Sequence, residues 1–191
     1  MLASGSERRV KLLKSLGVSF RQVVPDVDET PKPGESAEAC ASRLARAKAH
    51  AAATAGPGLY LAADTLVCLD GEIVGKPRDL DHAAQILRRL SGRRHRVVTA
   101  DTLLEKPSGR ERETVEVSEV EIRVLSEEQI RAYVATGEAM GKAGAYAIQE
   151  RGDRFVKRID GSYTNVVGLP IERVTPMLAE FGVLTNDAGS R

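Results

Sequence analysis

Apolar and polar residues along the chain follow two spacings, one typical of strands and one typical of helices. The run from Leu59 to Ala63 is continuously apolar, which predicts a strand buried on both faces. Asp64 follows this run and places a carboxyl group at the expected C-terminal end of the strand. Farther along, apolar residues recur at helical spacing and predict a helix that Asp79 caps and Gly92 stops, with buried positions Ala83, Ile86, Leu87 and Leu90.

Further elements follow from the same spacings and from turn residues. Strands are predicted at residues 2–4, 20–24, 66–69, 72–74, 96–104, 115–125, 146–149 and 155–159, with a tight hairpin around Asp70-Gly71. Helices are predicted at residues 6–16, 36–53, 126–136 and 170–181. Ser6 is expected to cap the first of these helices, and Ser126 with Gln129 to form a capping box for the third. A change of phase in the apolar alternation near Ser118 predicts a β-bulge.

These elements mix strands and helices without a repeat or a long linker, which favours an α/β fold. We expect a mixed twisted β-sheet flanked by helices, arranged as two lobes with a central cleft. Residues 1–184 are expected to form a single domain, followed by a polar C-terminal tail at residues 185–191.

The charge balance and the aromatic content exclude some classes of function. The chain carries 28 basic and 27 acidic residues, for a net charge of +1, and 4% of its residues are aromatic. General nucleic-acid binders usually show a basic excess and aromatic stacking platforms, so no nucleic-acid partner is expected. Any attraction for an anion must therefore be local.

Cysteine usage and the N-terminal segment indicate the compartment. Cys40 and Cys68 are far apart and flanked by apolar residues, as expected of buried free thiols in a reducing compartment. The chain has no CxxC pair and its histidines are scattered, so no zinc site is expected. The N-terminus lacks the features of a signal peptide, and no apolar stretch approaches the roughly 20 residues that span a bilayer. We expect a cytoplasmic protein with no membrane partner.

The first candidate site is the turn Ser4-Gly5-Ser6, which leads into a predicted helix. The free N–H groups and the positive dipole of a helix N-terminus are suited to phosphate. On the helical wheel Arg9 falls in the middle of the apolar stripe, and Arg8 lies at its edge. A buried arginine needs an anionic partner. That partner is either a bound phosphate or a carboxylate of the protein, unless Arg9 points past the end of the stripe.

Asp64 is the second candidate, because ligands of α/β proteins bind at the C-terminal ends of strands. Its carboxylate would hold a divalent cation or orient a water, or else it caps a turn. Lys76, in Gly75-Lys76-Pro77, would either reach phosphate oxygens or lie on the surface of a turn. The glycine spacing and Pro77 exclude a P-loop.

Two further polar groups are candidates for ligand binding. Glu29 belongs to an acidic loop whose carboxylates would help to coordinate Mg²⁺, although simple solvation is the preferred explanation for Asp26 and Asp28. Gln149 ends a short apolar segment, and its amide would either read the edge of a base or bond to backbone.

Taken together, these segments resemble the Maf family of nucleoside triphosphate pyrophosphatases. The matching stretches occur in family order and cover roughly Leu2 to Phe181. They are Leu2-Ala3-Ser4-Gly5-Ser6 with Arg8-Arg9 and Leu12-Leu13, Ala63-Asp64-Thr65, Gly75-Lys76-Pro77, Leu90-Ser91-Gly92 with His95, Gly144-Ala145-Tyr146 through Ile148-Gln149, Ile159 to Tyr163, and Val166 to Pro170.

The resemblance implies an α/β fold with a cleft, related in shape to the inosine triphosphate pyrophosphatases. It also implies hydrolysis of a nucleotide substrate to its monophosphate and pyrophosphate, with a divalent metal cation, Mg²⁺ or Mn²⁺, as cofactor. By position, Asp64 would be the proton acceptor and would share the metal with Glu29. The residues that would bind the phosphates are Ser4, Arg9, Lys48 and Lys76.

Base selection is also implied by the resemblance. Arg8, Thr65 and Gln149 match the positions that set base choice, and they match the branch that acts on dTTP and UTP. The chain departs from the family pattern at Glu7, where proline is usual, and at Glu150-Arg151, where a glycine is usual. A homodimer is a family-level expectation. An alternative function is a nucleotide-binding regulator of septum formation in cell division, with incidental turnover.

Overall fold

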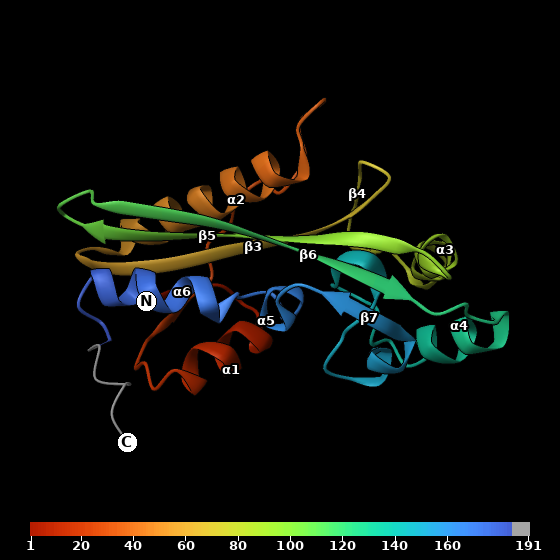
Figure 1. The fold of residues 1–191 in the computed structure, drawn as a ribbon. Coiled ribbons are helices and arrows are strands. Elements are labelled where there is room, and N and C mark those ends of the chain that lie inside the picture. The colour runs from red at the N-terminus through yellow and green to blue at the C-terminus, as the bar shows by residue number, and fades with distance from the viewer. Residues whose placement is uncertain (185–191) are drawn as a thin grey trace, which may run out of the picture.

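The computed structural model describes residues 1–184, which build a mixed sheet flanked by helices (Figure 1). The strands lie in the order β2-β1-β3-β5-β6-β7, and β4 pairs with β3 outside this path. β1 runs parallel to β2 and β3, whereas the other neighbours are antiparallel. The bounds are β1 (Leu2–Ala3), β2 (Gln22–Val23), β3 (Gly58–Leu69), β4 (Glu72–Val74), β5 (Arg94–Lys106), β6 (Glu111–Ile122) and β7 (Val156–Asp160). The predicted α/β fold is confirmed, and the predicted tail at residues 185–191 lies outside the described residues.

Helices cover both faces of the sheet (Figure 1). α2 (Ala37–Ala52) lies on one face, and α1 (Glu7–Ser15), α5 (Tyr163–Val167) and α6 (Ile171–Glu180) lie on the other. α3 (Leu80–Leu90) and α4 (Glu127–Val134) pack together at the far end of the long strands, where they build the second lobe. Among residues 1–184, no helix is long and apolar enough to cross a membrane.

The first lobe has a separate apolar layer on each face of the sheet. The alanines of α2 allow this helix to approach the sheet closely, and Ala41 and Ala45 pack with Val98 of β5. On the opposite face, Leu13 of α1 and Leu178 of α6 pack in a cluster with Leu61 and Leu103 of the central strands. The strands β3 and β5 are therefore covered on both sides, as their apolar runs predict.

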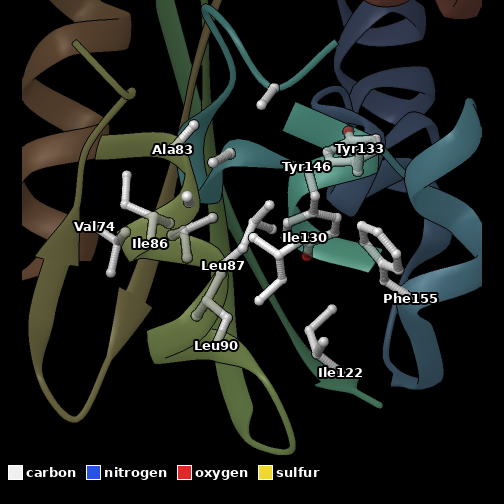
Figure 2. Close-up of a cluster of buried hydrophobic side chains, with 14 of the residues drawn as sticks. Val74, Ala83, Ile86, Leu87, Leu90, Ile122, Ile130, Tyr133, Tyr146 and Phe155 are labelled. Carbon is white, nitrogen blue, oxygen red and sulfur yellow. The ribbon is translucent and has the colours of Figure 1, made fainter. Parts of the chain in front are cut away.

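The second lobe has its own core, drawn in Figure 2. Leu87 and Leu90 project from α3 toward Ile130 of α4 and Ile122 of β6. The cluster also includes Tyr146, from the segment that follows the 3-10 helix Ala143–Ala145. This packing anchors that segment to the lobe, and the segment in turn forms one wall of the cleft described below.

Local capping and turn chemistry agree with the sequence. The Ser6 side chain accepts a hydrogen bond from the Arg9 backbone N–H, and that of Asp79 accepts one from His82. Ser126 and Gln129 form the predicted capping box of α4. The hairpin between β3 and β4 turns at Asp70-Gly71, where both residues have positive φ.

The position of Asp64 corrects one prediction. Asp64 does not end a strand, because β3 continues unbroken from Gly58 to Leu69. The residues after Asp64 keep the strand going because Thr65 to Cys68 pair with β5 without a shift in register. The segment predicted as two strands at residues 59–63 and 66–69 is therefore a single long strand.

Two other predictions are wrong, and one helix was missed. The pairing of β5 with β6 is regular through Ser118; the irregularity lies at Glu121/Ile122, against β7. The apolar phase changes near Ser118 because that buried hydroxyl donates to the Ser162 carbonyl, not because of an extra residue. Residues 146–149 are not a strand, since Tyr146 and Ala147 have no regular structure and Ile148 and Gln149 lie in a turn; α5 was not predicted.

The core of the second lobe should be sensitive to a cavity in α3. Leu87 is 1% exposed, so Leu87→Ala should lower the free energy of unfolding by about 2–5 kcal/mol. The neighbouring Arg88→Ala removes only a surface ion pair with Glu127 and should cost less than about 1 kcal/mol. Urea denaturation of both variants measures the difference, and equal losses would contradict this packing.

Candidate active site

A cleft of about 490 Å³ lies between the two lobes, within the size range of small-molecule sites. Its lining comes from the turn at residues 3–9, the loop that holds Glu29, α2 at Lys48, β3 at Asp64 and Thr65, Lys76, and the segments 140–150 and 166–168. Elements distant in sequence therefore meet at one concave surface.

Asp64 and Thr65 reach this cleft because one edge of β3 is free at their position. β1 pairs with β3 at Leu61, and β4 does not begin to pair until Val67. Consecutive residues of a strand point to opposite faces. Asp64 accordingly contacts Lys48 of α2 on one face, and Thr65 contacts Arg9 of α1 on the other.

The buried ammonium of Lys48 joins two carboxylates. Its Nζ lies 2.5 Å from Asp64 Oδ1 and 2.6 Å from Glu29 Oε1. Lys48 is 8% exposed and Asp64 6%, so each would be costly to hold in this environment without the other. The charges of these three groups are mutually dependent.

Glu29 also receives a second lysine. Lys76 Nζ lies 2.6 Å from Glu29 Oε2, at the more exposed side of the cleft. Burial raises the pKa of Glu29, but hydrogen bonds from Lys48 and Lys76 outweigh it and lower this pKa to about 2. Glu29 is therefore ionised at every pH at which the protein is expected to work.

One carboxylate oxygen of Asp64 is buried without a partner among the described residues. Asp64 Oδ2 is buried and accepts no hydrogen bond, although its residue lines the cleft. No group of three or more His, Cys, Asp or Glu residues among residues 1–184 is placed to hold a metal. Asp64 and Glu29 are instead two carboxylates that line the cleft, a donor set that fits Mg²⁺ bound mainly through waters and substrate phosphates.

Arg9 lies deep in the cleft without a carboxylate partner within residues 1–184. Its Nε donates to the Gly168 carbonyl at 2.7 Å, and its two terminal nitrogens donate to Ser4 Oγ and Thr65 Oγ1 at 3.2 and 3.0 Å. Burial lowers the pKa of Arg9, and the charge of Asp64 opposes that effect. The guanidinium stays charged. The internal salt bridge considered from the sequence is therefore not found in the described part of the chain.

The other predicted residues of the N-terminal turn lie beside Arg9. Ser4 is buried and also accepts a hydrogen bond from the backbone N–H of Ser6 at 3.2 Å. Arg8 lines the cleft. Its side chain makes no hydrogen bond or ion pair to any residue that the structure describes, so it is available to a ligand.

The far end of the cleft is formed by the segment 140–150. Gln149 is exposed in a turn and is not part of the lining, although its neighbours Ile148 and Glu150 are. Asp26 and Asp28 do not line the cleft either, and Asp28 accepts a hydrogen bond from the Thr30 backbone. The structure thus gathers all the predicted site residues except Gln149 directly around one cavity.

A buried histidine supports this far wall from behind. His95 is 3% exposed, and its Nε2 lies 2.7 Å from the hydroxyl of Tyr146, which lines the cleft. Burial lowers the pKa of His95 to about 4, so the ring is neutral at physiological pH.

Two polar residues near Arg9 were missed from the sequence. Thr99 and Asp101 are fully buried in β5, on the face where Thr65 meets Arg9. Burial raises the pKa of Asp101 to about 8, although the charge of Arg9 acts in the other direction. A usable signal was present, because polar residues two positions apart interrupt an otherwise apolar strand.

Comparison with known proteins identifies the family. A family model described as Maf-like protein matches residues 1–181. The chain belongs to the Maf family. The resemblance inferred from the ordered motifs is thereby confirmed.

Two named relatives align with nearly the whole length of this Maf family chain. A dTTP/UTP pyrophosphatase from Salmonella typhimurium is 49% identical over 185 residues, which are 96% of this chain and 93% of the relative. A dTTP/UTP pyrophosphatase from Syntrophomonas wolfei is 48% identical over 189 residues, which are 97% of this chain and 100% of the relative.

Solved structures give only a weak likeness. The Staphylococcus aureus Ham1 protein is 19% identical and aligns over 63% of this chain and 70% of its own, with a TM-score of 0.46. A nucleoside-triphosphatase / dITP/XTP pyrophosphatase from Mycobacterium abscessus is 18% identical and aligns over 97% of this chain and 96% of its own, with a TM-score of 0.42. Likenesses this weak do not establish a common shape, so a shape related to the inosine triphosphate pyrophosphatases stays a prediction.

The lowered pKa of His95 should make folding stability depend on pH. The unfolded chain takes up a proton near pH 6.5 and the folded chain only near pH 4, so stability is lost as the pH falls through this window. Between pH 7 and pH 5 the loss due to His95 should be about 2 kcal/mol. His95→Gln should flatten this pH dependence of stability in urea denaturation. An unchanged slope in His95→Gln would contradict a neutral buried ring.

Proposed function

We propose that this protein is a nucleoside triphosphate pyrophosphatase that hydrolyses dTTP and UTP to the monophosphate and pyrophosphate. The relatives at 48–49% identity carry that name. The single observation that supports it best is the charge arrangement of the cleft. Asp64, whose buried Oδ2 has no partner among the described residues, lines the same cavity as Arg9, a cation without a carboxylate partner among residues 1–184.

The phosphates are proposed to bind to the cationic side of the cleft. Arg9 keeps N–H groups free beyond its three hydrogen bonds, and Ser4 holds the guanidinium in place. Lys48 and Lys76 already contact carboxylates, and their ammonium groups have further donors for phosphate oxygens. Cations placed in advance stabilise the charge that develops on the leaving pyrophosphate.

Asp64 is proposed to be the proton acceptor. Its Oδ1 is held by Lys48, which fixes the carboxylate, and its buried Oδ2 has no partner among the described residues, so we assign to Oδ2 the role of orienting and deprotonating a water that enters with the substrate. That water would attack the α-phosphorus and displace pyrophosphate.

Asp64 and Glu29 are proposed to hold a divalent cation, Mg²⁺ or Mn²⁺. When bound, this cation would neutralise charge on the phosphates and lower the pKa of a coordinated water. The ammonium of Lys48 lies between the two carboxylates and, together with Lys76 on Glu29, offsets their charge until the cation and the substrate arrive.

Base choice is proposed to depend on Arg8, Thr65 and Gln149. Arg8 has an uncommitted guanidinium at the cleft, and Thr65 has its hydroxyl there. Gln149 lies in an exposed turn beside the lining, from which its amide would need to turn inward on binding.

The setting of the reaction follows from the substrate. We infer that the protein works in the cytoplasm, where nucleotides are available and where the buried thiols of Cys40 and Cys68 stay reduced. We further propose that residues 1–184 act as one domain, that no nucleic acid or membrane takes part, and that the protein forms a homodimer.

Removal of the proposed proton acceptor, Asp64, tests the reaction. Asp64→Asn should lower kcat by about 10²–10⁴-fold, because it removes the proton acceptor. Pyrophosphate release is measured from a panel of nucleoside triphosphates with Mg²⁺, with Mn²⁺ and with EDTA, which should abolish turnover. The control Asp26→Asn alters an exposed carboxylate outside the cleft and should keep wild-type activity. Near-normal hydrolysis by folded Asp64→Asn would refute the assignment.

Wild-type behaviour in the same assay also separates the two classes of function. Release of pyrophosphate from dTTP and UTP supports an enzyme. Tight binding of nucleotide without any turnover would instead favour a regulator of septum formation.

The residues proposed to select the base can be tested separately, by the ratio of kcat/KM among nucleotides. Arg8→Ala and Gln149→Ala should shift the ratio of kcat/KM among the nucleotides of the panel by about 10-fold, since each would remove a polar contact to the base. The exposed Arg78, outside the cleft, offers the matched control Arg78→Ala, which should leave the profile unchanged. A profile that stays the same in Arg8→Ala and Gln149→Ala would exclude these residues from base selection.

A further inference from the structure

A chain of hydrogen bonds lies behind Thr65. Thr99 of β5 is directly opposite Thr65 of β3, and the two hydroxyl oxygens are 2.9 Å apart. Thr99 Oγ1 is also 3.0 Å from the backbone carbonyl of Asn165 in α5. Asn165 is itself fully buried and fixed, because its Nδ2 donates to the Val97 carbonyl and to Ser118 Oγ.

The direction of this chain follows from donor counting. A carbonyl oxygen only accepts, so the single hydroxyl proton of Thr99 is donated to Asn165. The contact between the two threonines must then be donated by Thr65. Thr65 also accepts a hydrogen bond from Arg9 Nη2 at 3.0 Å. One acceptor position on the Thr65 oxygen remains, and no donor.

This remaining position is available to a ligand. Thr65 lines the cleft and is only partly buried. The neighbouring residue is Gly168, where a Cβ atom would come within 3.3 Å of Thr65 Oγ1. The absence of that atom keeps the hydroxyl oxygen open.

An oxygen that only accepts is unsuited to phosphate. Ionised phosphate oxygens are themselves acceptors, so any substrate group that bonds to Thr65 is a donor, and the nucleoside half of the substrate supplies such donors. A uracil or thymine ring offers such a donor in its imide N–H, which lies between two carbonyl groups. Cytosine has a lone pair at the same ring nitrogen.

We propose that Thr99 is a positioning residue that commits Thr65 to accept a hydrogen bond from the imide N–H of uracil or thymine. Cytosine would place two acceptors face to face at this point. A buried polar group without a partner lowers kcat/KM by about 10-fold or more. The inference rests on the proposed pyrophosphatase activity and names the contact by which that activity selects its base.

The test compares kcat/KM for UTP and CTP in the wild type, in Thr99→Val and in Thr99→Ser. Valine has nearly the same shape as threonine but cannot accept from Thr65, whose hydroxyl would then be free to donate to cytosine. The UTP-to-CTP ratio should fall about 10-fold or more in Thr99→Val and recover in Thr99→Ser. A purely structural role would lower both rates together, and an unchanged ratio would overturn the proposal.

Substrate analogues test the same contact without altering the protein. UTP methylated at the imide nitrogen should lose about 10-fold or more in kcat/KM on the wild type, whereas UTP methylated at carbon 5 controls for added size. Equal rates for the two methylated nucleotides would overturn the proposal. A loss with 3′-deoxy-UTP and none with the imide-methylated nucleotide would also overturn it, by assigning the donor to the sugar.

The two proposals fail in different ways. A wild type that turns over UTP but shows an unmoved ratio in Thr99→Val refutes the positioning role alone. Absence of any turnover in the wild type refutes the pyrophosphatase activity and this contact with it.

Discussion

The ammonium of Lys48 is the constraint on which the cleft depends. It lies between Asp64 and Glu29, and neither the buried Lys48 nor the buried Asp64 would be tolerated there without an opposite charge. The helix that carries it, α2, is rich in alanine and so approaches the sheet closely enough for a lysine to reach β3. The small side chains that let α2 pack closely against the sheet therefore also allow Lys48 to balance charge in the site.

Much of this architecture could be predicted from the sequence. Local signals were reliable where a residue type has one specific local role, as in the Ser6 and Asp79 helix caps and the Asp70-Gly71 turn. The site residues could be named because ordered motifs tie them to a family. The gathering of Arg9, Lys48 and Asp64 around one cavity could not be read from spacing, since they lie on two helices and a strand.

Two of the wrong predictions share a physical cause. A polar residue in a strand was interpreted as an end or an irregularity, at Asp64 and at Ser118. Both residues instead continue their strands, and each has a tertiary partner: Lys48 contacts Asp64, and the Ser162 carbonyl accepts from Ser118. Thr99 and Asp101 were overlooked for the same reason. The spacing of apolar and polar residues gives no information about these partners, which come from elements far away along the chain.

The free edge of β3 has a consequence for how this fold can diversify. Asp64 and Thr65 are adjacent in sequence, yet the backbone of one strand separates their side chains. With the roles proposed for them, bond cleavage and base recognition are assigned to opposite sides of the same sheet. A substitution at Thr65 can therefore change base recognition while Asp64 and Lys48 stay intact, so new substrate preferences can evolve beside an unaltered proton acceptor.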